Sequence, residues 1–309
     1  TSLRAQHRYP EAAASLRRAI SLESGRADFH FHLGEALRAT SDFAGARAAF
    51  ARTLELAPDH LQARYYHSDL LARDQQLEAA RQGFAALLAQ DSTHFQGLLG
   101  FGGLLITLGA AQQAATQLER AATIAPHNPG PHYLLAQAYE QSDRPQEAKN
   151  ARERFQRLSA AERHLNQGNI YIRRREWAKA ATELGRALHN DSTSVAILLR
   201  LATVHGQQHR PEHSITLLQE AITLAPDHLE AQLALGDFQL RSGDLAAAGS
   251  RFERALALAP DSFDAAYGLG RVRWQNGELP DAVNALRRAL ALNPDHRDAH
   301  YALGLVYVR

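Results

Sequence analysis

The 309-residue sequence contains neither cysteine nor methionine. Without cysteine the chain has no disulfide bond, no thiolate metal ligand and no thiol nucleophile. The two missing residues are also readily oxidised, so their absence suits an exported protein. Lysine is nearly absent as well, occurring only at Lys149 and Lys179, and so strong a bias towards arginine indicates a GC-rich bacterial gene. We therefore expect a bacterial protein that is periplasmic or exported, with the cytoplasm as the alternative.

The sequence also has little net charge and no long apolar run. Its 34 basic and 33 acidic residues leave a formal charge of +1, so there is no general positive field that would attract nucleic acid. No stretch of about 20 apolar residues is present, which is the length that a membrane-spanning helix needs. We see no signal peptide. We expect no nucleic acid partner and no membrane insertion.

Candidate catalytic and metal-binding patterns are weak. The chain has no glycine-rich phosphate loop and no Ser/His/Asp arrangement. His205, His209 and His213 have the spacing of helical metal ligands, but Pro211 separates the last two, so the three cannot share one helix face. We expect no catalytic residue, no metal and no cofactor, and therefore a protein that is not an enzyme.

What the sequence has in abundance is a repeat of 34 residues with a small residue at one fixed position. A larger side chain there would push two crossing helices apart. The small residues, with one interval of 32, are Ala12, Ala46, Ala80, Ala114, Ala148, Ala180, Ser214, Ala248 and Ala282. Four residues further on, all positions but one are apolar, as the seam of a helix pair requires. These are Leu16, Phe50, Phe84, Leu118, Arg152, Leu184, Leu218, Phe252 and Leu286.

Proline, aspartate and glycine mark the expected helix ends. All 11 prolines fall at expected boundaries and none lies in a helix interior. Aspartates that directly follow a closing proline are expected to N-cap the next helix, which also explains the Asp-His pairs at 59–60, 227–228 and 295–296. These aspartates are Asp59, Asp227, Asp261 and Asp295. Gly109, Gly243 and Gly277 are expected in turns between helices.

The unit at 229–262, LEAQLALGDFQLRSGDLAAAGSRFERALALAPDS, shows the whole pattern and resembles the tetratricopeptide repeat, a helix–turn–helix unit. The resemblance implies an all-α, right-handed solenoid of about nine repeats, truncated at both ends. We expect a single array over 1–309, with an N-terminal block at 1–160 and a C-terminal block at 161–309. The repeat at 129–160 is irregular, because it is two residues short and lacks a closing proline. Neither end carries a polar capping helix, so we expect a segment of something longer, or ends that are covered.

Basic residues gather around the irregular repeat. Between Asp143 and Lys179 there are ten lysines and arginines against five acidic residues. A solvated charged face explains such a cluster, and so does a docking patch for an anionic partner. The arginines of this predicted basic patch are Arg152, Arg154, Arg157, Arg173, Arg174 and Arg175.

In tetratricopeptide-repeat proteins the first helix of each unit lines a concave groove, and the resemblance implies which residues line it here. A stripe at the repeat spacing is aromatic or aliphatic, and acidic residues lie one turn away. The predicted groove residues are Phe31, Glu35, Tyr65, Asp69, Tyr133, Asp237, Tyr267, Arg271, Trp274 and Tyr301. Rigid aromatic rings beside carboxylates suit a protein or peptide with apolar and basic residues. The competing explanation is that the stripe only packs neighbouring helices.

We therefore expect a non-catalytic protein–protein interaction scaffold or adaptor that binds a partner segment in its groove, alone or within a larger complex. One alternative is a non-catalytic arm of a larger enzyme such as a glycosyltransferase. Another is a bacterial envelope scaffold for polysaccharide export. Some members of the family clamp a peptide carboxylate with lysine, arginine and asparagine. The matching positions here are aromatic and acidic, so that function is not implied.

Overall fold

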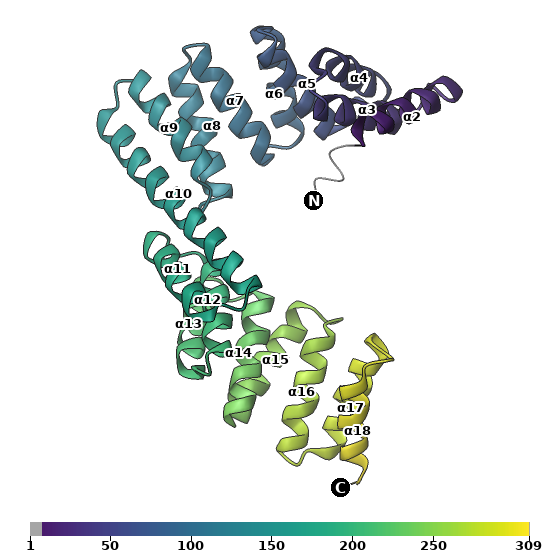
Figure 1. Cartoon of the computed structure of the whole chain (residues 1–309), viewed down its shortest axis with the longest axis vertical. Coiled ribbons are helices and arrows are strands. Elements are labelled where there is room, and N and C mark those ends of the chain that lie inside the picture. Colours follow the sequence, from purple (N-terminus) through teal and green to yellow (C-terminus); the bar gives the residue numbers. More distant parts are fainter. Residues whose placement is uncertain (1–7, 309) are drawn as a thin grey trace. The chain divides into compact units, whose positions relative to one another are not determined.

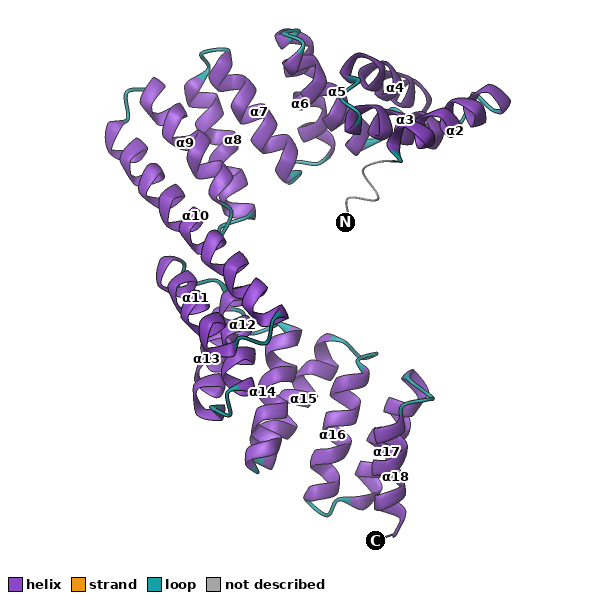
Figure 2. Cartoon of the chain, in the orientation of Figure 1, coloured by secondary structure: helices purple, strands orange, loops and turns teal. Residues whose placement is uncertain are grey.

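The computed structural model describes residues 8–308, and this part of the chain consists of helices joined by short turns (Figures 1 and 2). It forms seventeen α-helices, with no strand among the described residues. Their bounds are α2 (Tyr9–Leu22), α3 (Ala27–Ala39), α4 (Phe43–Leu56), α5 (Leu61–Arg73), α6 (Leu77–Gln90), α7 (Phe95–Thr107), α8 (Ala111–Ile124), α9 (Pro129–Gln141), α10 (Pro145–Arg173), α11 (Trp177–Asn190), α12 (Val195–Gln207), α13 (Pro211–Leu224), α14 (Leu229–Ser242), α15 (Leu245–Leu258), α16 (Phe263–Gln275), α17 (Leu279–Leu292) and α18 (Arg297–Val308).

The helices form successive antiparallel pairs, in which we call the first helix A and the second helix B. Helices α3, α5, α7, α9, α12, α14, α16 and α18 are A helices. Helices α2, α4, α6, α8, α11, α13, α15 and α17 are B helices, and α10 is both a B and an A helix. The prolines lie where the sequence predicts: Pro10, Pro145, Pro211 and Pro280 stand in first turns of helices, and Pro129 opens α9.

Every turn from an A helix to its B helix contains one residue in the left-handed region. Gly109, Gly243 and Gly277 adopt φ values of 74°, 84° and 82°, which confirms the predicted glycine turns. Five other turns place a non-glycine residue at the same point of the repeat, at a steric cost that glycine avoids. These are Ser41, Gln75, Asp143, Arg175 and His209, with φ between 56° and 64°.

The small-residue position explains how closely each A and B helix approach. From Ala46 to Ala282 the small residues are fully buried, at 0% exposure. The A helices carry a small residue at the facing position, often glycine. A Cβ atom added to Gly102 would lie 2.5 Å from the Leu118 side chain, and one added to Gly270 would lie 2.7 Å from Leu286. At these glycines the backbone of the A helix therefore contacts a side chain of the B helix directly, and there is no room for one more methyl group.

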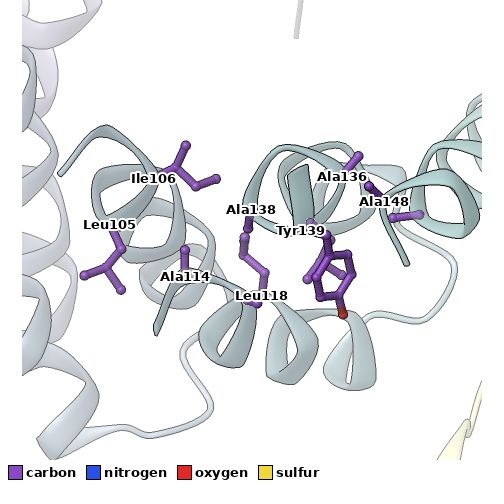
Figure 3. Packing of buried hydrophobic residues seen from close by; sticks show 11 residues of the cluster. Leu105, Ile106, Ala114, Leu118, Ala136, Ala138, Tyr139 and Ala148 are labelled. Carbon is purple, nitrogen blue, oxygen red and sulfur yellow. The ribbon is translucent and has the colours of Figure 1, made fainter. Parts of the chain in front are cut away.

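The buried residues form a series of clusters along the repeats, because each repeat packs on its neighbours. Figure 3 shows the cluster in which Leu105 and Ile106 of α7, Leu118 of α8, Tyr139 of α9 and Ala148 of α10 meet. Equivalent clusters lie around Phe50, around Phe84, around Leu198 and around Phe252. The core is thus a seam that runs through the repeats.

No turn separates the irregular repeat from the repeat that follows it. Its B helix continues into the next A helix as a single 29-residue helix, α10. Elsewhere four residues separate a B helix from the next A helix, as between Leu56 and Leu61. With two residues missing, and with neither proline nor glycine from 146 to 167, nothing in the sequence stops the helix. By proximity of residues, the chain divides within α10 into two compact units, Thr1–Leu158 and Ser159–Arg309.

Arg152 does not occupy a core position, contrary to the register assumed from the repeat. Its side chain is 51% exposed and forms an ion pair with Glu140. The buried face of this part of α10 consists of Ala148, Ala151 and Leu158 instead.

The predicted aspartate caps are wrong by one residue. The side chains of His60, His228 and His296, and that of Ser262, accept the backbone N–H groups at the starts of α5, α14, α18 and α16. His94 does the same at the start of α7, where no Asp-His pair exists. An imidazole Nδ1 reaches the N–H three residues on as a serine oxygen does. The aspartates before these caps lie in the preceding turns.

Candidate partner-binding surface

Within each unit several consecutive A helices contact one another and so form a row. Helix α5 contacts α7 and α7 contacts α9 in the first unit, while α14 contacts α16 and α16 contacts α18 in the second. Residues that recur on A helices at the repeat spacing therefore follow one another along the row. All ten predicted groove residues lie on A helices, five in each unit.

In the first unit the aromatic stripe is partly buried. The ring of Phe31 lies 4.4 Å from that of His60, and the ring of Tyr65 lies 5.7 Å from that of His94, measured between centroids. Each aromatic residue thus packs against the histidine that caps the next A helix. Tyr133 retains more open surface, at 52% exposure, beside the ring of Phe155 at 5.4 Å. The stripe joins repeats together and still presents aromatic surface.

The stripe of the second unit follows the same arrangement. Tyr267 is stacked on Phe263 at 5.7 Å and lies 5.5 Å from the capping His296. Trp274 is half-buried against the cluster that contains Leu286. Tyr301, on α18, is 69% exposed.

The acidic residues beside the stripe are less available than the sequence suggests. Asp237 forms ion pairs with Arg241 on its own helix and with Arg271, whose nitrogen lies 3.5 Å away on the next A helix. Glu35 accepts a hydrogen bond from the Nδ1 of His32, at 2.9 Å. The carboxylate of Asp237 is therefore neutralised by two arginines of its own unit.

Asp69 differs from the other acidic residues because it forms no ion pair among the contacts of the described residues. The surrounding helices hold the pKa of this carboxyl above its ordinary value by desolvation, and Arg38 and Arg73 oppose the shift. Burial also raises the pKa of the Tyr65 hydroxyl, with the negative charge of Asp69 adding to it. Asp69 is nevertheless exposed to solvent on α5, one turn from the half-buried Tyr65, so its carboxylate is accessible beside the aromatic stripe.

The predicted basic patch is split between the two units. Arg152, Arg154 and Arg157 belong to the first unit, whereas Arg173, Arg174 and Arg175 belong to the second, at the end of α10 and in the turn after it. Arg152 is paired with Glu140. The six arginines are therefore divided three and three between the units, and at least one of them is paired.

Arg154 belongs to a recurring contact that the sequence analysis missed. Its guanidinium donates to the backbone carbonyl oxygen of Pro126, at 3.4 Å, in the turn after the preceding B helix. Arg120 makes the matching bond to Ser92 and Arg288 the matching bond to Pro260, both at 2.5 Å. A cation at the carbonyl end of a helix is favourable. Arginine recurs at the same position of the repeat at 120, 154, 254 and 288, and this recurrence in the sequence could have indicated a shared contact.

Beside Arg154 lies an open pocket of about 460 Å³ between α8, α9 and α10. On its wall the Tyr139 hydroxyl donates to Glu119 at 2.8 Å. Burial, followed by this bond to a carboxylate, raises the pKa of Tyr139 to about 12. The contact ties two repeats of the first unit together.

Two of the three histidines with metal-like spacing meet in space. His205 of α12 and His213 of α13 face each other across one helix pair, with ring centroids 5.3 Å apart. Burial lowers the pKa of His205, and the positive charge of His213 adds to the effect. Among residues 8–308, no group of three or more metal-binding side chains is gathered at one point.

No helix between residues 8 and 308 is long and apolar enough to cross a membrane.

Comparison with known families gives a consistent result over most of the array. Two family models, both described as "Tetratricopeptide repeat", match the chain. One matches residues 105–163 and 239–306, and the other matches residues 1–60, 36–95 and 199–263, which is more than half of the chain. No curated protein matches it.

Three solved structures illustrate the likeness. YrrB, a TPR protein with an unusual peptide-binding site, is 19% identical, with a TM-score of 0.42 over 71% of this chain and 96% of its own. MamA from Desulfovibrio magneticus RS-1 is 22% identical, with a TM-score of 0.47 over 48% of this chain and 85% of its own. A chain of the APC/C hetero-tetramer Cut9–Hcn1 is 17% identical, with a TM-score of 0.46 over 94% and 59%. At these TM-scores, none of them carries a partner over to this chain.

Proposed function

Because this chain belongs to the tetratricopeptide-repeat family, we propose that it is a non-catalytic interaction scaffold that binds a segment of a partner protein along its A helices. Stacked repeats produce extended surfaces of this kind, and a partner segment can lie across several of them. We place the principal contact on the first unit, along α3, α5, α7 and α9.

The observation that carries the proposal is the exposure of Tyr133 in line with Phe31 and Tyr65. A tyrosine that only packed repeats together would be largely covered, as Tyr139 is at 9% exposure, whereas Tyr133 is 52% exposed. Tyrosine offers a large contact area and loses little side-chain entropy on binding. The row thus supplies aromatic anchor points at the repeat spacing.

The acidic residue beside the aromatic stripe indicates which charge the partner segment should carry. Asp69 lies one turn from Tyr65 on α5, at an exposed position, and its carboxyl has a pKa above the ordinary value. An arginine or lysine of the partner would favour the ionised carboxylate there. We therefore propose a segment with apolar anchors and a basic residue between them. In the second unit Asp237 is already paired, so Tyr267 contributes apolar contact rather than charge.

The test uses a displayed library of random peptides selected on the full-length immobilised chain. Enriched peptides are expected to combine aromatic or aliphatic residues with arginine or lysine. The best peptide should bind the Tyr133→Ala and Asp69→Asn variants at least about tenfold more weakly than the parent, which corresponds to about 1.4 kcal/mol.

Tyr9→Ala is the matched control, since Tyr9 is also partly exposed, at 36%, but lies on α2 outside the row. Circular dichroism of each variant establishes that the helices are retained. If peptides selected on the parent bind Tyr133→Ala and Asp69→Asn as tightly as they bind Tyr9→Ala, the first row is not the binding surface.

A further inference from the structure

One position of the A helices bonds to a carboxylate of the preceding B helix in both units. Tyr139 of α9 donates to Glu119 of α8 at 2.8 Å in the first unit. Arg273 of α16 donates to Glu253 of α15 at 2.6 Å in the second unit. In both pairs the carboxylate comes twenty positions earlier in the sequence. The repeat spacing therefore determines which two residues meet at this point of neighbouring helices.

At the equivalent point of α12 this internal carboxylate is missing. The A-helix residue is His205, and twenty positions earlier α11 has Gly185. A Cβ atom added to Gly185 would meet nothing within 4 Å. The pocket beside His205 is open and measures about 350 Å³, and the residues that line it come from α12 and α13. In the equivalent pocket of the first unit, Glu119 of the preceding B helix lines the wall that is absent here.

The residue facing His205 from α13 also differs from its equivalents. At this position of the repeat, Glu147 lines the pocket of α9 and Asp281 lines that of α16. The residue in α13 is His213, whose ring lies 5.3 Å from that of His205 between centroids. The pocket of α12 and α13 therefore has two imidazoles at positions where the other pockets have acidic residues.

The charges around His205 suit an anion. Its Nδ1 donates to the Oε1 of Gln208 at 3.2 Å, so Nε2 becomes a second donor when the ring is protonated. Burial lowers the pKa of His205, the bond to Gln208 opposes this shift, and the positive charges of His213 and Arg210 add to it. Among the described residues no carboxylate contributes, although the exposed Glu212 also lines the pocket. A bound anion would supply the opposite charge that this imidazole lacks.

We propose that the carboxylate of an aspartate or glutamate from a partner protein enters this pocket and binds His205 and His213. It would lie beside His205 as Glu119 lies beside Tyr139. Protonated imidazoles would donate to its oxygens, so the affinity should rise as the pH falls. The pocket belongs to the second unit and is separate from the aromatic row of the first unit, so it would be a second contact point for a partner.

The chain itself can be given the missing carboxylate. Gly185→Glu places one at the position that Glu119 and Glu253 occupy in their repeats, without a clash because nothing lies within 4 Å of Gly185. Gly185→Gln is the matched control, since it has the same size and no charge. The pKa of His205 is measured in the full chain by NMR, with its signal assigned from His205→Gln. We expect a pKa higher by about 1 or more in Gly185→Glu than in Gly185→Gln. Equal values would contradict the proposal.

Binding is tested on the full chain with the first row disabled by Tyr133→Ala and Asp69→Asn. A displayed library of random peptides is selected at pH 6.0 in the presence of EDTA, so that no metal ion can bridge the imidazoles. Enriched peptides are expected to contain aspartate or glutamate. Adding Gly185→Glu or His205→Gln should weaken binding of the best peptide at least about tenfold, and so should a change to pH 7.5.

Gln219→Glu is the matched control for this loss of binding. It adds a carboxylate at the same position of the repeat, exposed on α13, where the residue twenty positions later is Gln239 rather than a histidine. This variant should bind the peptide as tightly as the selected chain.

Three results would overturn the proposal. These are a library that yields no acidic peptide, a peptide whose affinity survives replacement of its acid by the amide, and equal binding by Gly185→Glu and Gln219→Glu. Peptides selected on the first row of the parent should bind Gly185→Glu as tightly as the parent. Failure of one surface can therefore be told apart from failure of the other.

Discussion

The Nδ1 atom of His94 lies 3.0 Å from the backbone nitrogen of Gly97 and accepts its N–H group at the start of α7. His60 and His228 cap α5 and α14 in the same way, at 3.2 Å and 3.4 Å. An imidazole nitrogen accepts a hydrogen bond only when it carries no proton, so the second ring nitrogen must carry it. The rings of His60 and His94 also pack on an aromatic residue of the preceding repeat, Phe31 and Tyr65 respectively.

If the cap is the main role of His94, asparagine should replace it and alanine should not. His94→Ala is expected to lower the free energy of unfolding by about 1 kcal/mol, while His94→Asn should stay close to the parent. Thermal unfolding followed by circular dichroism gives the stability, and hydrogen exchange of the first-turn amides of α7 locates the change. Equal losses for the two variants would mean that ring packing on Tyr65 matters more than the cap.

The left-handed turn residues provide a second prediction. Gln75 has a φ of 58°, so Gln75→Gly should relieve steric strain and stabilise the chain by about 1 kcal/mol. Gln82, exposed inside α6, is the matched control, because Gln82→Gly should destabilise by about 0.5–1 kcal/mol through the low helix propensity of glycine. Opposite shifts of the unfolding midpoint for one substitution at two sites are the expected result. A loss of stability in both variants would contradict the role of φ at Gln75.

Features determined within one repeat could be predicted from the sequence, and features that depend on several residues acting together could not. The buried alanines and glycine turns follow from local geometry, so Ala248 and Gly243 lie where the spacing places them. The caps formed by His60, His228 and His296 were missed because the aspartate before each has a higher intrinsic preference for the same role. The continuity of α10 follows from two missing residues, which removed a turn that the repeat pattern led us to expect.

Charge on the candidate binding surface was the least predictable property. From the sequence, Asp237 was expected to be an acidic residue of the groove without a partner. In the structure it pairs with Arg271, which lies in the next repeat, one full period away in the sequence. Such a pairing depends on how two A helices lie side by side. The exposure of Tyr133 and the coverage of Phe31 likewise depend on the neighbouring residues Phe155 and His60, which the stripe alone does not reveal.

Close packing at the helix seam leads to a third prediction. Gly102→Ala would place a methyl group 2.5 Å from Leu118, so the helix pair α7–α8 must separate, and a loss of about 1–3 kcal/mol is expected. Gly185→Ala, with open space around it, should instead gain up to about 1 kcal/mol from helix propensity. Because repeats couple to their neighbours, hydrogen exchange should accelerate in α7 and α8 more than in α16 and α17. Uniform acceleration along the whole chain would contradict local coupling.

The fourth prediction concerns pH and rests on three half-buried histidines. Burial lowers the pKa of His67, His132 and His205, and nearby positive groups add to the shift, among them Arg47 for His67 and Arg154 for His132. In the unfolded chain a histidine has a pKa of about 6.5. The unfolded state therefore binds more protons than the folded state in the range just below that value, and stability rises with pH there.

The stability that these neutral histidines provide should be fully present above about pH 6.5 and should decline as the pH falls from there to their lowered folded pKa values. The temperature at the midpoint of thermal unfolding should therefore decrease as the pH is lowered from about 7.5 to about 5.5. His132→Gln cannot be protonated, so it should reduce this dependence, whereas His189→Gln, at an exposed position on α11, should leave it as in the parent. The raised pKa of Asp69 has the opposite sign, because the folded state then binds more protons than the unfolded state above the ordinary pKa of an aspartate. A midpoint that rises on acidification, or a His132→Gln variant with the full pH dependence, would show that desolvation of these imidazoles does not govern the response.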